Sequence, residues 1–408
     1  MIKIAILGYG VVGSGIYEVI MGHLDEIKDR THEEIEVKYI LDLRDFDVPH
    51  KHLFVKDFDV ILKDPEVAIV VEAMGGLHPA YDFAKAALEN GKSVVTSNKE
   101  VVAEKGGELL NLAKKKNLNY LFEASVGGGI PIIRPINQCL AANNIDSVAG
   151  ILNGTTNYIL TEMFTNGKTF EAALKEAQNK GYAEANPSAD VDGLDACRKI
   201  CILASLCFGK HIYPKTVYTE GIRNIDNDDV ALAEANGSII KLIGKASLEK
   251  NGKIAVMVAP FVIKKSSPLY SVNDVFNGIL VRGDALGDAM FYGKGAGKLP
   301  TASAAVADII DGMKHMHARK YLCWEETEPS DMEVIIEQHE NCEFSYLVRA
   351  EGIDEANVYT AFGECGVKKA KGTSGYKVGP AVEKDFVLAK ESLEKETGKN
   401  IKYYRILK

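Results

Sequence analysis

The chain lacks several features that mark secreted, membrane-spanning and nucleic-acid-binding proteins. Its seven cysteines are an odd number and include no Cys-x-x-Cys pair, so they do not suggest a disulfide framework. No apolar run is long enough to span a membrane, and no signal-peptide pattern is present. The 48 basic residues are outnumbered by 57 acidic ones, and a net charge of −9 disfavours nucleic acid as a partner. We therefore expect a cytoplasmic protein that binds neither nucleic acid nor membranes.

Three of the cysteines, Cys197, Cys201 and Cys207, fall within one apolar helical stretch. A free cysteine in such a position packs as a small hydrophobic side chain. We interpret these cysteines as part of a core, with a metal-thiolate site as the alternative.

The length of 408 residues favours two or three domains. Residues 1–130 alternate short apolar runs with helical patterns, which is typical of an α/β fold with a doubly wound parallel sheet. The expected strands are Lys3–Leu7, Ile35–Leu41, Val67–Val71, Ser93–Thr96 and Tyr120–Ala124. The expected helices begin at Ser14 or cover Pro79–Glu89 and Val101–Lys116.

Residues 131–326 show longer helical patterns mixed with extended segments, which predicts an α+β second domain. The clearest helical patterns are Lys168–Lys180, Asp192–Phe208 and Thr301–Met313, and the clearest extended segments are Ile254–Ile263 and Asn277–Arg282.

A linker at Thr327–Ser330 separates a C-terminal region, 331–408, with the pattern β-α-β-β-α-β. This order is the ferredoxin-like arrangement. The expected strands are Glu343–Ala350, Val367–Lys371, a short one near Tyr376, and Ile401–Leu407, and the expected helices are Glu355–Cys365 and Val382–Lys395.

The loop after the first strand has the pattern G-x-G-x-x-G, with Gly8, Gly10 and Gly13. It follows a strand and opens a helix, the context in which this motif binds a dinucleotide pyrophosphate. Together with Val11 and Val12, these glycines predict an NAD(P) site on a Rossmann domain, 1–130. A glycine-rich turn without a ligand is the alternative.

The second strand ends in Leu41-Asp42-Leu43-Arg44. An acidic residue there binds the ribose hydroxyls of NAD, whereas an arginine favours the 2′-phosphate of NADP. Asp42 and Arg44 are both present, so NAD and NADP stay open, as does the interpretation of each as a solvated charge.

The loops that follow the third and fourth strands should border the cofactor crevice, because ligands bind at the carboxyl ends of such strands. The second of these loops contains Ser97, Asn98 and Lys99. Lys99 is thus placed to meet the substrate or the nicotinamide. An ordinary exposed lysine is the alternative.

A second candidate site lies in the helical stretch after Pro187. Asp192, Asp195 and Lys199 are spaced to share one helix face, and the residues after Lys199 are apolar. Burial would favour loss of the lysine proton, whereas Asp195 would favour its retention, and such a pair suits proton transfer. A surface ion pair is the alternative, and Asp190 is a candidate helix cap.

Four segments together resemble the homoserine dehydrogenase family. They are LGYGVVGSGI, then GKSVVTSNKEVVAEKGGEL with FEASVGGGIPII, then LNGTTNYIL with GYAEANPSADVDGLDACRK, and GKGAGKLPTASAAVADI. The resemblance covers about residues 1–315. It implies the reversible NAD(P)-dependent oxidation of L-homoserine to L-aspartate 4-semialdehyde in threonine and methionine biosynthesis, by a homodimer or homotetramer. It also implies that residues 131–326 form the substrate-binding, catalytic and dimerisation domain.

The resemblance also implies roles for individual residues. Lys199 is the proton donor and acceptor with Asp195 beside it, Lys99 lies near the substrate oxygen and nicotinamide, Glu184 receives the substrate ammonium, and Asp190 is a further substrate-site carboxylate.

The same resemblance implies a sodium site in the loop FEASVGGGIP, formed by Glu123 and the backbone carbonyls of Val126, Gly128 and Ile130. An interdomain hinge is the alternative for this loop. The C-terminal region resembles an ACT domain, but Gly352–Ala356 replaces the expected Pro-Gly-apolar turn, so threonine binding is not predicted. Another amino-acid dehydrogenase and a catalytically silent nucleotide sensor are the competing functions.

Overall fold

The computed structural model describes residues 1–317, 322, 324–363, 366–370 and 373–407. The chain forms two compact units built from non-contiguous segments. Unit 1 comprises Met1–Asn144, Cys201–Lys215 and Gly293–Pro329, and unit 2 comprises Ile145–Ile200, Thr216–Tyr292 and Ser330–Lys408. The three-domain division at 130 and 326 stays a prediction.

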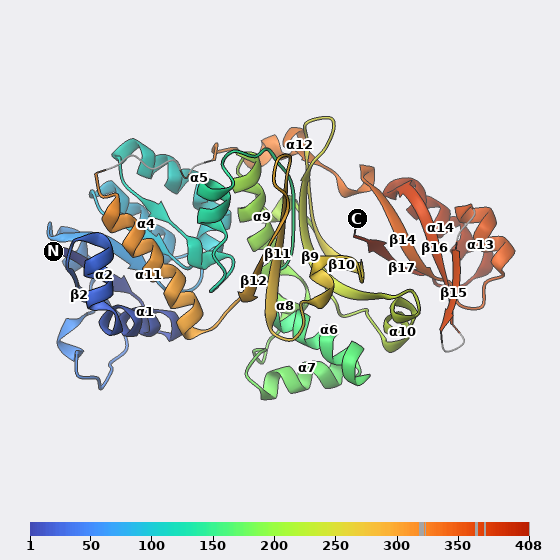
Figure 1. The fold of residues 1–408 in the computed structure, drawn as a ribbon, viewed down its shortest axis with the longest axis horizontal. Helices are drawn as coiled ribbons and strands as arrows, with labels where there is room; N and C mark the ends of the chain where they lie inside the picture. The colour runs from blue at the N-terminus through green and yellow to red at the C-terminus, as the bar shows by residue number, and fades with distance from the viewer. Residues whose placement is uncertain (318–321, 323, 364–365, 371–372, 408) are drawn as a thin grey trace. The chain divides into compact units, whose positions relative to one another are not determined.

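Unit 1 is built on a six-stranded parallel sheet with the order β3-β2-β1-β4-β5-β6. This is the doubly wound order of dinucleotide-binding domains. The first segment of unit 1 is drawn in blue to teal in Figure 1. The strands are β1 (Ile2–Leu7), β2 (Ile35–Leu41), β3 (Phe54–Val55), β4 (Val67–Glu72), β5 (Ser93–Thr96) and β6 (Tyr120–Leu121). The predicted α/β class is confirmed.

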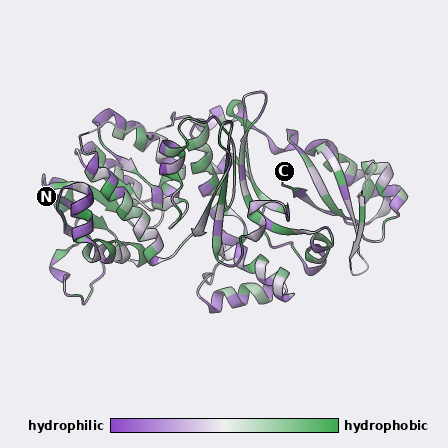
Figure 2. Ribbon diagram, in the orientation of Figure 1, coloured by the Kyte–Doolittle hydropathy of each residue, from purple (hydrophilic) through white to green (hydrophobic). Residues whose placement is uncertain are grey.

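The helices of unit 1 are α1 (Val11–Gly22), α2 (Leu24–Thr31), α3 (Phe58–Lys63), α4 (Ala80–Glu89), α5 (Lys99–Lys116) and α11 (Lys298–Lys314). Several boundaries differ from the sequence prediction by one to three residues. Helix α1 begins at Val11 rather than Ser14, and the last strand ends at Leu121 because Glu123–Ser125 form a 3-10 turn. Figure 2 shows helices with both hydrophobic and hydrophilic residues, as expected for helices that cover a sheet.

Unit 2 is built on an 11-stranded mixed sheet with the path β12-β11-β7-β9-β10-β17-β14-β16-β15. Its long strands are β7 (Ile145–Ile151), β9 (Ser238–Leu248), β10 (Ile254–Lys264), β11 (Phe276–Gly283) and β12 (Gly287–Lys294), and short strands β8 (Tyr218–Thr219) and β13 (Ile336–Glu337) pair with β10. Before the C-terminal region, unit 2 contains helices α6 (Gly154–Asn166), α7 (Phe170–Asn179), α8 (Ser188–Val191), α10 (Asn227–Ala235) and α12 (Met332–Ile335). Helix α9 (Leu194–Phe208) begins in unit 2, and the boundary between the units falls within it.

The C-terminal region has the predicted β-α-β-β-α-β order. It comprises β14 (Glu343–Arg349), α13 (Glu355–Phe362), β15 (Gly366–Ala370), β16 (Thr373–Val382), α14 (Glu383–Thr397) and β17 (Lys402–Ile406). The strand order β17-β14-β16-β15 is the fourth-first-third-second order of a ferredoxin-like sheet. The strand at Tyr376 is ten residues long rather than short. The predicted helix end at Cys365 and strand end at Lys371 lie outside the described residues.

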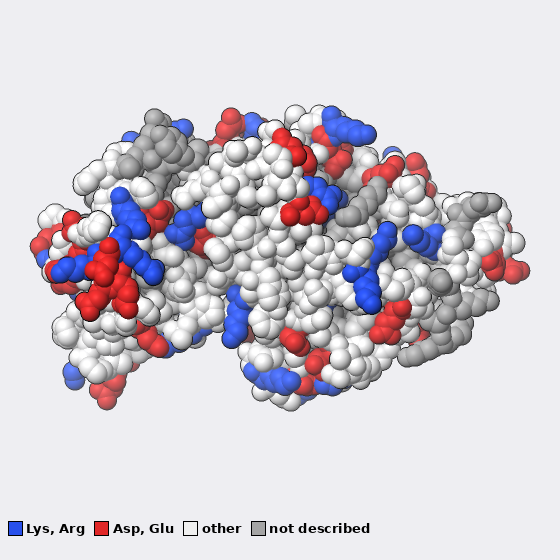
Figure 3. Space-filling model, viewed as in Figure 1, with Lys and Arg blue, Asp and Glu red and all other residues white. Residues whose placement is uncertain are grey.

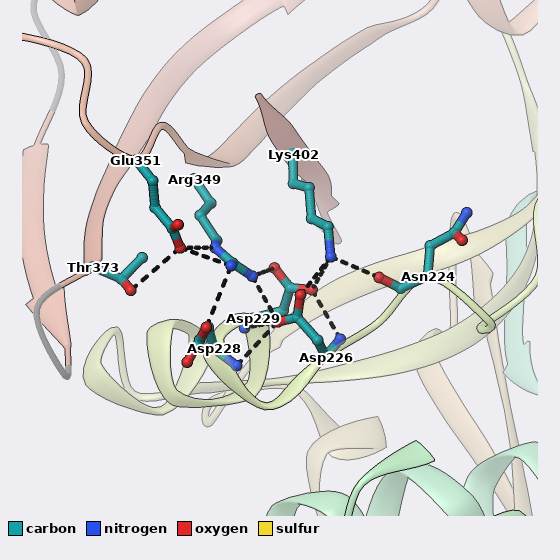
Figure 4. A network of polar contacts seen from close by, with 8 residues as sticks. All are labelled: Asn224, Asp226, Asp228, Asp229, Arg349, Glu351, Thr373 and Lys402. Atoms are coloured by element: carbon teal, nitrogen blue, oxygen red, sulfur yellow. Dashed lines mark hydrogen bonds and ion pairs between the residues drawn. The ribbon is translucent and has the colours of Figure 1, made fainter. Parts of the chain in front are cut away.

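This region continues the main sheet of unit 2 rather than forming a separate sheet, because β17 pairs in parallel with β10. A charged cluster adds to the attachment (Figure 4). Arg349 of β14 lies 2.6 Å from Asp226 and 2.9 Å from Asp229, at the start of α10, and Lys402 of β17 contacts both carboxylates at 2.6 and 3.1 Å. Asp229 is fully buried within this cluster.

Acidic and basic side chains intermingle on the face of the molecule that Figure 3 shows. Within the described residues, no helix is long and apolar enough to cross a membrane. Cys197 and Cys201 are buried in α9, which confirms that they pack in a core, and Cys207 is partly buried. Cys323 and Cys365 lie outside the described residues.

Candidate functional site

The glycine loop between β1 and α1 has three glycines in three different environments. Gly8 has a φ of +91°, a conformation that side chains disfavour. A Cβ on Gly13 would lie 1.9 Å from the carbonyl oxygen of Gly8, so no other residue fits there. A Cβ on Gly10 would meet nothing within 4 Å, so the backbone at Gly10 is open to a ligand. Val11, at the helix start, is 67% exposed.

A cavity of 450 Å³ lies beside this loop, lined by Gly8, Gly10, Asp42, Arg44, Lys56 and Met74 among others. These residues come from the loops that follow the carboxyl ends of β1, β2, β3 and β4, which is where dinucleotides bind in doubly wound sheets. The structure thus brings Asp42 and Arg44 together with two of the three motif glycines.

Asp42 and Arg44 form an ion pair with each other. The Asp42 carboxylate accepts hydrogen bonds from the backbone N–H of Tyr9 at 2.8 Å and from the Arg44 side chain at 2.9 and 3.0 Å. Hydrogen bonding from Arg44 holds the pKa of Asp42 well below its usual range. The Asp42 side chain is 8% exposed and that of Arg44 is 64% exposed, so the guanidinium is the group that reaches solvent.

Two further loops, which follow β4 and β5, lie at the same edge of the sheet. Glu72, at the end of β4, accepts hydrogen bonds from the Thr96 hydroxyl and from the Met74 N–H. Burial raises the pKa of Glu72 to about 7. The Asn98 amide donates to the carbonyl of Gly76 at 2.8 Å, so the two loops are joined.

Ser97 and Lys99 lie in the second of these loops. The Ser97 N–H donates to the Glu72 carbonyl at 3.2 Å. Asn98 caps helix α5. The helix begins at Lys99, two residues before the start at Val101 that the sequence predicts. Ser97 and Lys99 are both partly buried.

The loop that contains Glu123 is held by its carboxylate. One oxygen accepts from the N–H groups of Ile132 and Ile133, at 2.5 and 2.8 Å, and the other accepts from the Arg134 N–H at 2.9 Å. Asp308 accepts from the Glu123 N–H at 2.7 Å. The Glu123 carboxylate is therefore fixed by the backbone of residues 132–134. Hydrogen-bonded carboxylates also occur as metal ligands, so the sodium site at this loop stays a prediction.

Asp195 and Lys199 form the second candidate site, on α9 in unit 2. Lys199 Nζ lies 2.9 Å from Asp195 Oδ2, and the two side chains are 8% and 4% exposed. The ammonium also donates to the carbonyl oxygen of Leu152 at 2.8 Å. The alternative of a surface ion pair is therefore wrong, because the pair is buried.

Other acidic residues of the same stretch lie in different places. Asp192 precedes α9 and pairs with Arg223 at the surface, so the prediction that it shares a helix face with Asp195 is wrong. Asp190 lies inside the short helix α8 rather than capping a helix. Gly193, with a φ of +83°, separates α8 from α9 and breaks the predicted continuous helix. Glu184 lies in the preceding segment, where its side chain is exposed.

Asn153 belongs to the second site but was not singled out as a functional residue from the sequence. Its side-chain amide donates to Asp190 Oδ1 at 2.7 Å and to Asp195 Oδ2 at 2.9 Å. Thr155, in the first turn of α6, holds the segment that contains Glu184, because its hydroxyl donates to the Tyr182 carbonyl. The only sequence signal was the Asn-Gly-Thr-Thr segment, which by itself indicates a turn and a helix cap.

Two family models match the chain. The model described as the NAD-binding domain of homoserine dehydrogenase matches residues 8–123, and the homoserine dehydrogenase model matches residues 131–310. The chain belongs to the homoserine dehydrogenase family. The resemblance inferred from the sequence motifs is thereby confirmed, and with it the class of NAD(P)-dependent oxidoreductases.

Relatives and solved structures from this family cover most of the chain. The homoserine dehydrogenase of Synechocystis is 46% identical and covers 76% of this chain and 73% of its own. That of Pseudomonas aeruginosa is 39% identical and covers 90% and 86%. The structure of a homoserine dehydrogenase from Thiobacillus denitrificans is 34% identical with a TM-score of 0.90, covering 100% of this chain and 98% of that one.

A fourth similar protein is a hyperthermophilic archaeal homoserine dehydrogenase mutant, solved in complex with NADPH. It is 29% identical with a TM-score of 0.63, and covers 76% of this chain and 97% of its own. This family member lacks a match to about a quarter of the present chain. The nucleotide it holds is consistent with the class of cofactor that the glycine loop predicts.

Metal ligation by side chains is not supported by the part of the chain that the structure describes. No group of three or more His, Cys, Asp or Glu residues there could hold a metal ion. The metal-thiolate alternative for Cys197, Cys201 and Cys207 is not supported.

Proposed function

We propose that the chain catalyses the reversible oxidation of L-homoserine to L-aspartate 4-semialdehyde with NAD(P). The observation that carries this proposal is the buried Asp195–Lys199 pair, in a member of the homoserine dehydrogenase family. A buried lysine held by one carboxylate and one backbone carbonyl can accept and return a proton at a fixed point. An exposed pair could not fix a proton in this way.

The oxidation removes a hydride from the carbon that bears the hydroxyl and a proton from the hydroxyl oxygen. NAD(P), when bound, takes the hydride. Lys199, as the neutral amine, accepts the proton directly or through a water molecule, and Asp195 stabilises the resulting ammonium. In the reverse direction the same ammonium returns the proton to the alkoxide oxygen. Atoms and charge balance in both directions.

The substrate is a zwitterionic amino acid, and its ammonium needs a carboxylate. We propose Glu184 for this role and Asp190 as a second carboxylate of the substrate site. The support is their position in the segment 182–190, which Thr155 of α6 and the cap residue Asn153 hold in place.

The cofactor site is proposed at Gly8, Gly10, Val11, Val12 and Gly13, with Ser97 and Lys99 at the nicotinamide end. The open backbone at Gly10 and the cavity beside it support the first part. The position of Lys99 at the carboxyl end of β5 supports the second.

We propose that the chain accepts NADP and NAD and prefers NADP. The Asp42 carboxylate is already occupied by Tyr9 and Arg44, so it is poorly placed to accept ribose hydroxyls. The exposed guanidinium of Arg44 and the ammonium of Lys56 line the same cavity and would attract a 2′-phosphate.

We propose that a monovalent cation at the loop 123–130 binds Glu123 and the backbone carbonyls of Val126, Gly128 and Ile130. A homodimer or homotetramer in the cytoplasm is proposed from the family alone, and light scattering of the purified protein would test the oligomer.

The proposed reaction is tested by measuring homoserine-dependent reduction of NAD and of NADP by the purified chain, with and without added threonine. We expect turnover with both nucleotides and a higher kcat/KM with NADP. The proposed reaction would be overturned if neither NAD nor NADP supports turnover. The comparison with threonine tests whether the C-terminal region, which departs from the ACT pattern at Gly352–Ala356, confers inhibition.

A further inference from the structure

Asn153 lies between β7 and α6 and is almost fully buried, with 6% of its surface exposed. Its amide oxygen accepts a hydrogen bond from the Thr156 N–H at 2.8 Å, which caps α6. Its amide nitrogen donates to Asp190 on α8 and to Asp195 on α9. One side chain therefore connects the N-terminus of α6 with α8 and with the first turn of α9.

The orientation of this amide is fixed by its neighbours. The reverse orientation would place the amide oxygen against two carboxylate oxygens and the NH₂ group against the Thr156 N–H. Both hydrogens of the nitrogen are used, one for each carboxylate. The donor function of Asn153 is thus directed at the acidic residues, and its acceptor function at the helix.

The same short connection holds Lys199. Leu152, the residue before Asn153, supplies the carbonyl that accepts from Lys199 Nζ at 2.8 Å. Asp195 Oδ2 receives hydrogen bonds from both Lys199 and Asn153, each at 2.9 Å. Residues 152 and 153 therefore fix the lysine, its carboxylate partner and the carboxylate of Asp190 relative to one another.

We propose that Asn153 is a positioning residue for the reaction, whose amide holds the substrate-site carboxylate Asp190 beside the Asp195–Lys199 pair. This inference rests on the proposed function. It assigns to Asn153 the task of fixing the distance between the Asp190 carboxylate and Lys199, the proton carrier.

A neutral donor is suited to this place for an electrostatic reason. Two carboxylates that share a buried site repel each other, and a donor between them reduces that repulsion. A lysine or arginine in the same place would do so more strongly, but it would compete with the substrate ammonium for Asp190 and with Lys199 for Asp195. An amide holds both carboxylates and leaves their charges available.

The test compares Asn153→Ser with Asn157→Ser in a double-mutant cycle with Asp190→Asn. Asn157 lies one turn further along α6 and is also buried, but its amide donates to the carbonyls of Val272 and Phe276. Serine retains a cap acceptor for Thr156 and loses the NH₂ group. We measure kcat and KM for homoserine and KM for the nucleotide in all variants, with circular dichroism and thermal unfolding to confirm the fold.

We expect Asn153→Ser to lower kcat/KM for homoserine by roughly tenfold to a hundredfold, the effect of losing hydrogen bonds to charged groups, with the nucleotide KM unchanged. In the Asp190→Asn background the same substitution should cost clearly less, because one of its two partners is already altered. Asn157→Ser should combine additively with Asp190→Asn. Additive behaviour of Asn153→Ser would overturn the proposal, since a residue that only caps α6 has no coupling to Asp190.

A second variant covers a failure of Asn153→Ser to fold. Asn153→Asp keeps the cap acceptor and replaces the donor with a third carboxylate. We expect a larger loss of kcat/KM, partly restored when Asp190→Asn removes one of the repelling charges. No restoration, or a failure of both Asn153 variants to fold, would show that Asn153 serves the helix alone. The wild-type chain is assayed in parallel, and its failure to oxidise homoserine would instead overturn the proposed reaction.

Discussion

Asp195 and Lys199 are joined by an ion pair of 2.9 Å in which both side chains are almost completely removed from solvent. Asp59 and Lys63 have the same four-residue spacing, but their side chains are 54% and 75% exposed. The spacing is therefore common to a surface pair and to the proposed catalytic pair. Burial is what distinguishes them.

The first prediction concerns this pair. Lys199→Ala should reduce kcat for homoserine oxidation by about 10²–10⁴-fold, the range expected for loss of a general acid and base. Nucleotide binding, followed by fluorescence titration, should persist because the glycine loop is unchanged. The exposed Lys63→Ala is the matched control and should retain wild-type kcat. Wild-type rates in Lys199→Ala would exclude this lysine as the proton carrier.

The fold could be predicted from the sequence where structure depends on local pattern. β2 and β5 have the predicted bounds, because each is a short segment with β-branched residues at buried positions and is followed by a charged or polar residue. The C-terminal order was predicted for the same reason. Helix starts were less accurate: α1 and α5 begin earlier than predicted, since the first helical turn is set by the loop and cap that precede it.

The parts of the site that could not be predicted depend on contacts between distant residues. Asn153 donates to carboxylates 37 and 42 residues further along the chain, and only the folded chain brings them together. The turn at Gly193 could not be recognised either, and it removed Asp192 from the predicted helix face. The pairing of β17 with β10 likewise joins two regions that the sequence presents as separate.

The second prediction separates the roles of two loop glycines. Gly10→Ala should leave the thermal unfolding temperature unchanged, because its Cβ meets no atom of the chain, and should weaken NADP binding because the Cβ projects where the backbone is open to a ligand. Gly13→Ala should weaken NADP binding and, unlike Gly10→Ala, should also lower the unfolding temperature, because its Cβ would lie 1.9 Å from the Gly8 carbonyl oxygen. Calorimetry and nucleotide titration measure both effects. Unaltered NADP affinity in Gly10→Ala would contradict the proposed pyrophosphate site.

The third prediction concerns the choice of nucleotide. Arg44→Ala should raise the KM for NADP by roughly tenfold or more, as expected from loss of a charge-assisted hydrogen bond to phosphate, and leave or improve the KM for NAD. The improvement would follow from release of the Asp42 carboxylate, which Arg44 now occupies. Arg282→Ala, which breaks an exposed ion pair with Asp288, is the control. Equal effects on both nucleotides would argue against selection by Arg44.

The fourth prediction is a pH dependence that arises from Glu72. Burial raises the pKa of Glu72 to about 7 in the folded chain, above the ordinary value of 4.5. The folded state therefore holds this proton more tightly than the unfolded state, and stability falls as pH rises from about 4.5 to 7. Glu72→Gln removes this loss, so its unfolding temperature relative to wild type should increase over that interval and level off above it. A difference that does not vary with pH would contradict the assignment.

The last prediction concerns the attachment of the C-terminal region. Arg349 and Lys402 both neutralise Asp229, whose side chain is fully buried, so the double variant Arg349→Met/Lys402→Met leaves that carboxylate without its two cations. Loss of the partners of a buried charge costs about 3–5 kcal/mol. We expect a lower unfolding temperature and faster hydrogen exchange in β14 and β17. Adding Asp226→Asn and Asp229→Asn should recover most of the loss, because asparagine still caps α10 and carries no charge. If the double variant unfolds at the wild-type temperature, the attachment must depend on other contacts, such as the β10–β17 pairing and the Arg405–Glu220 ion pair.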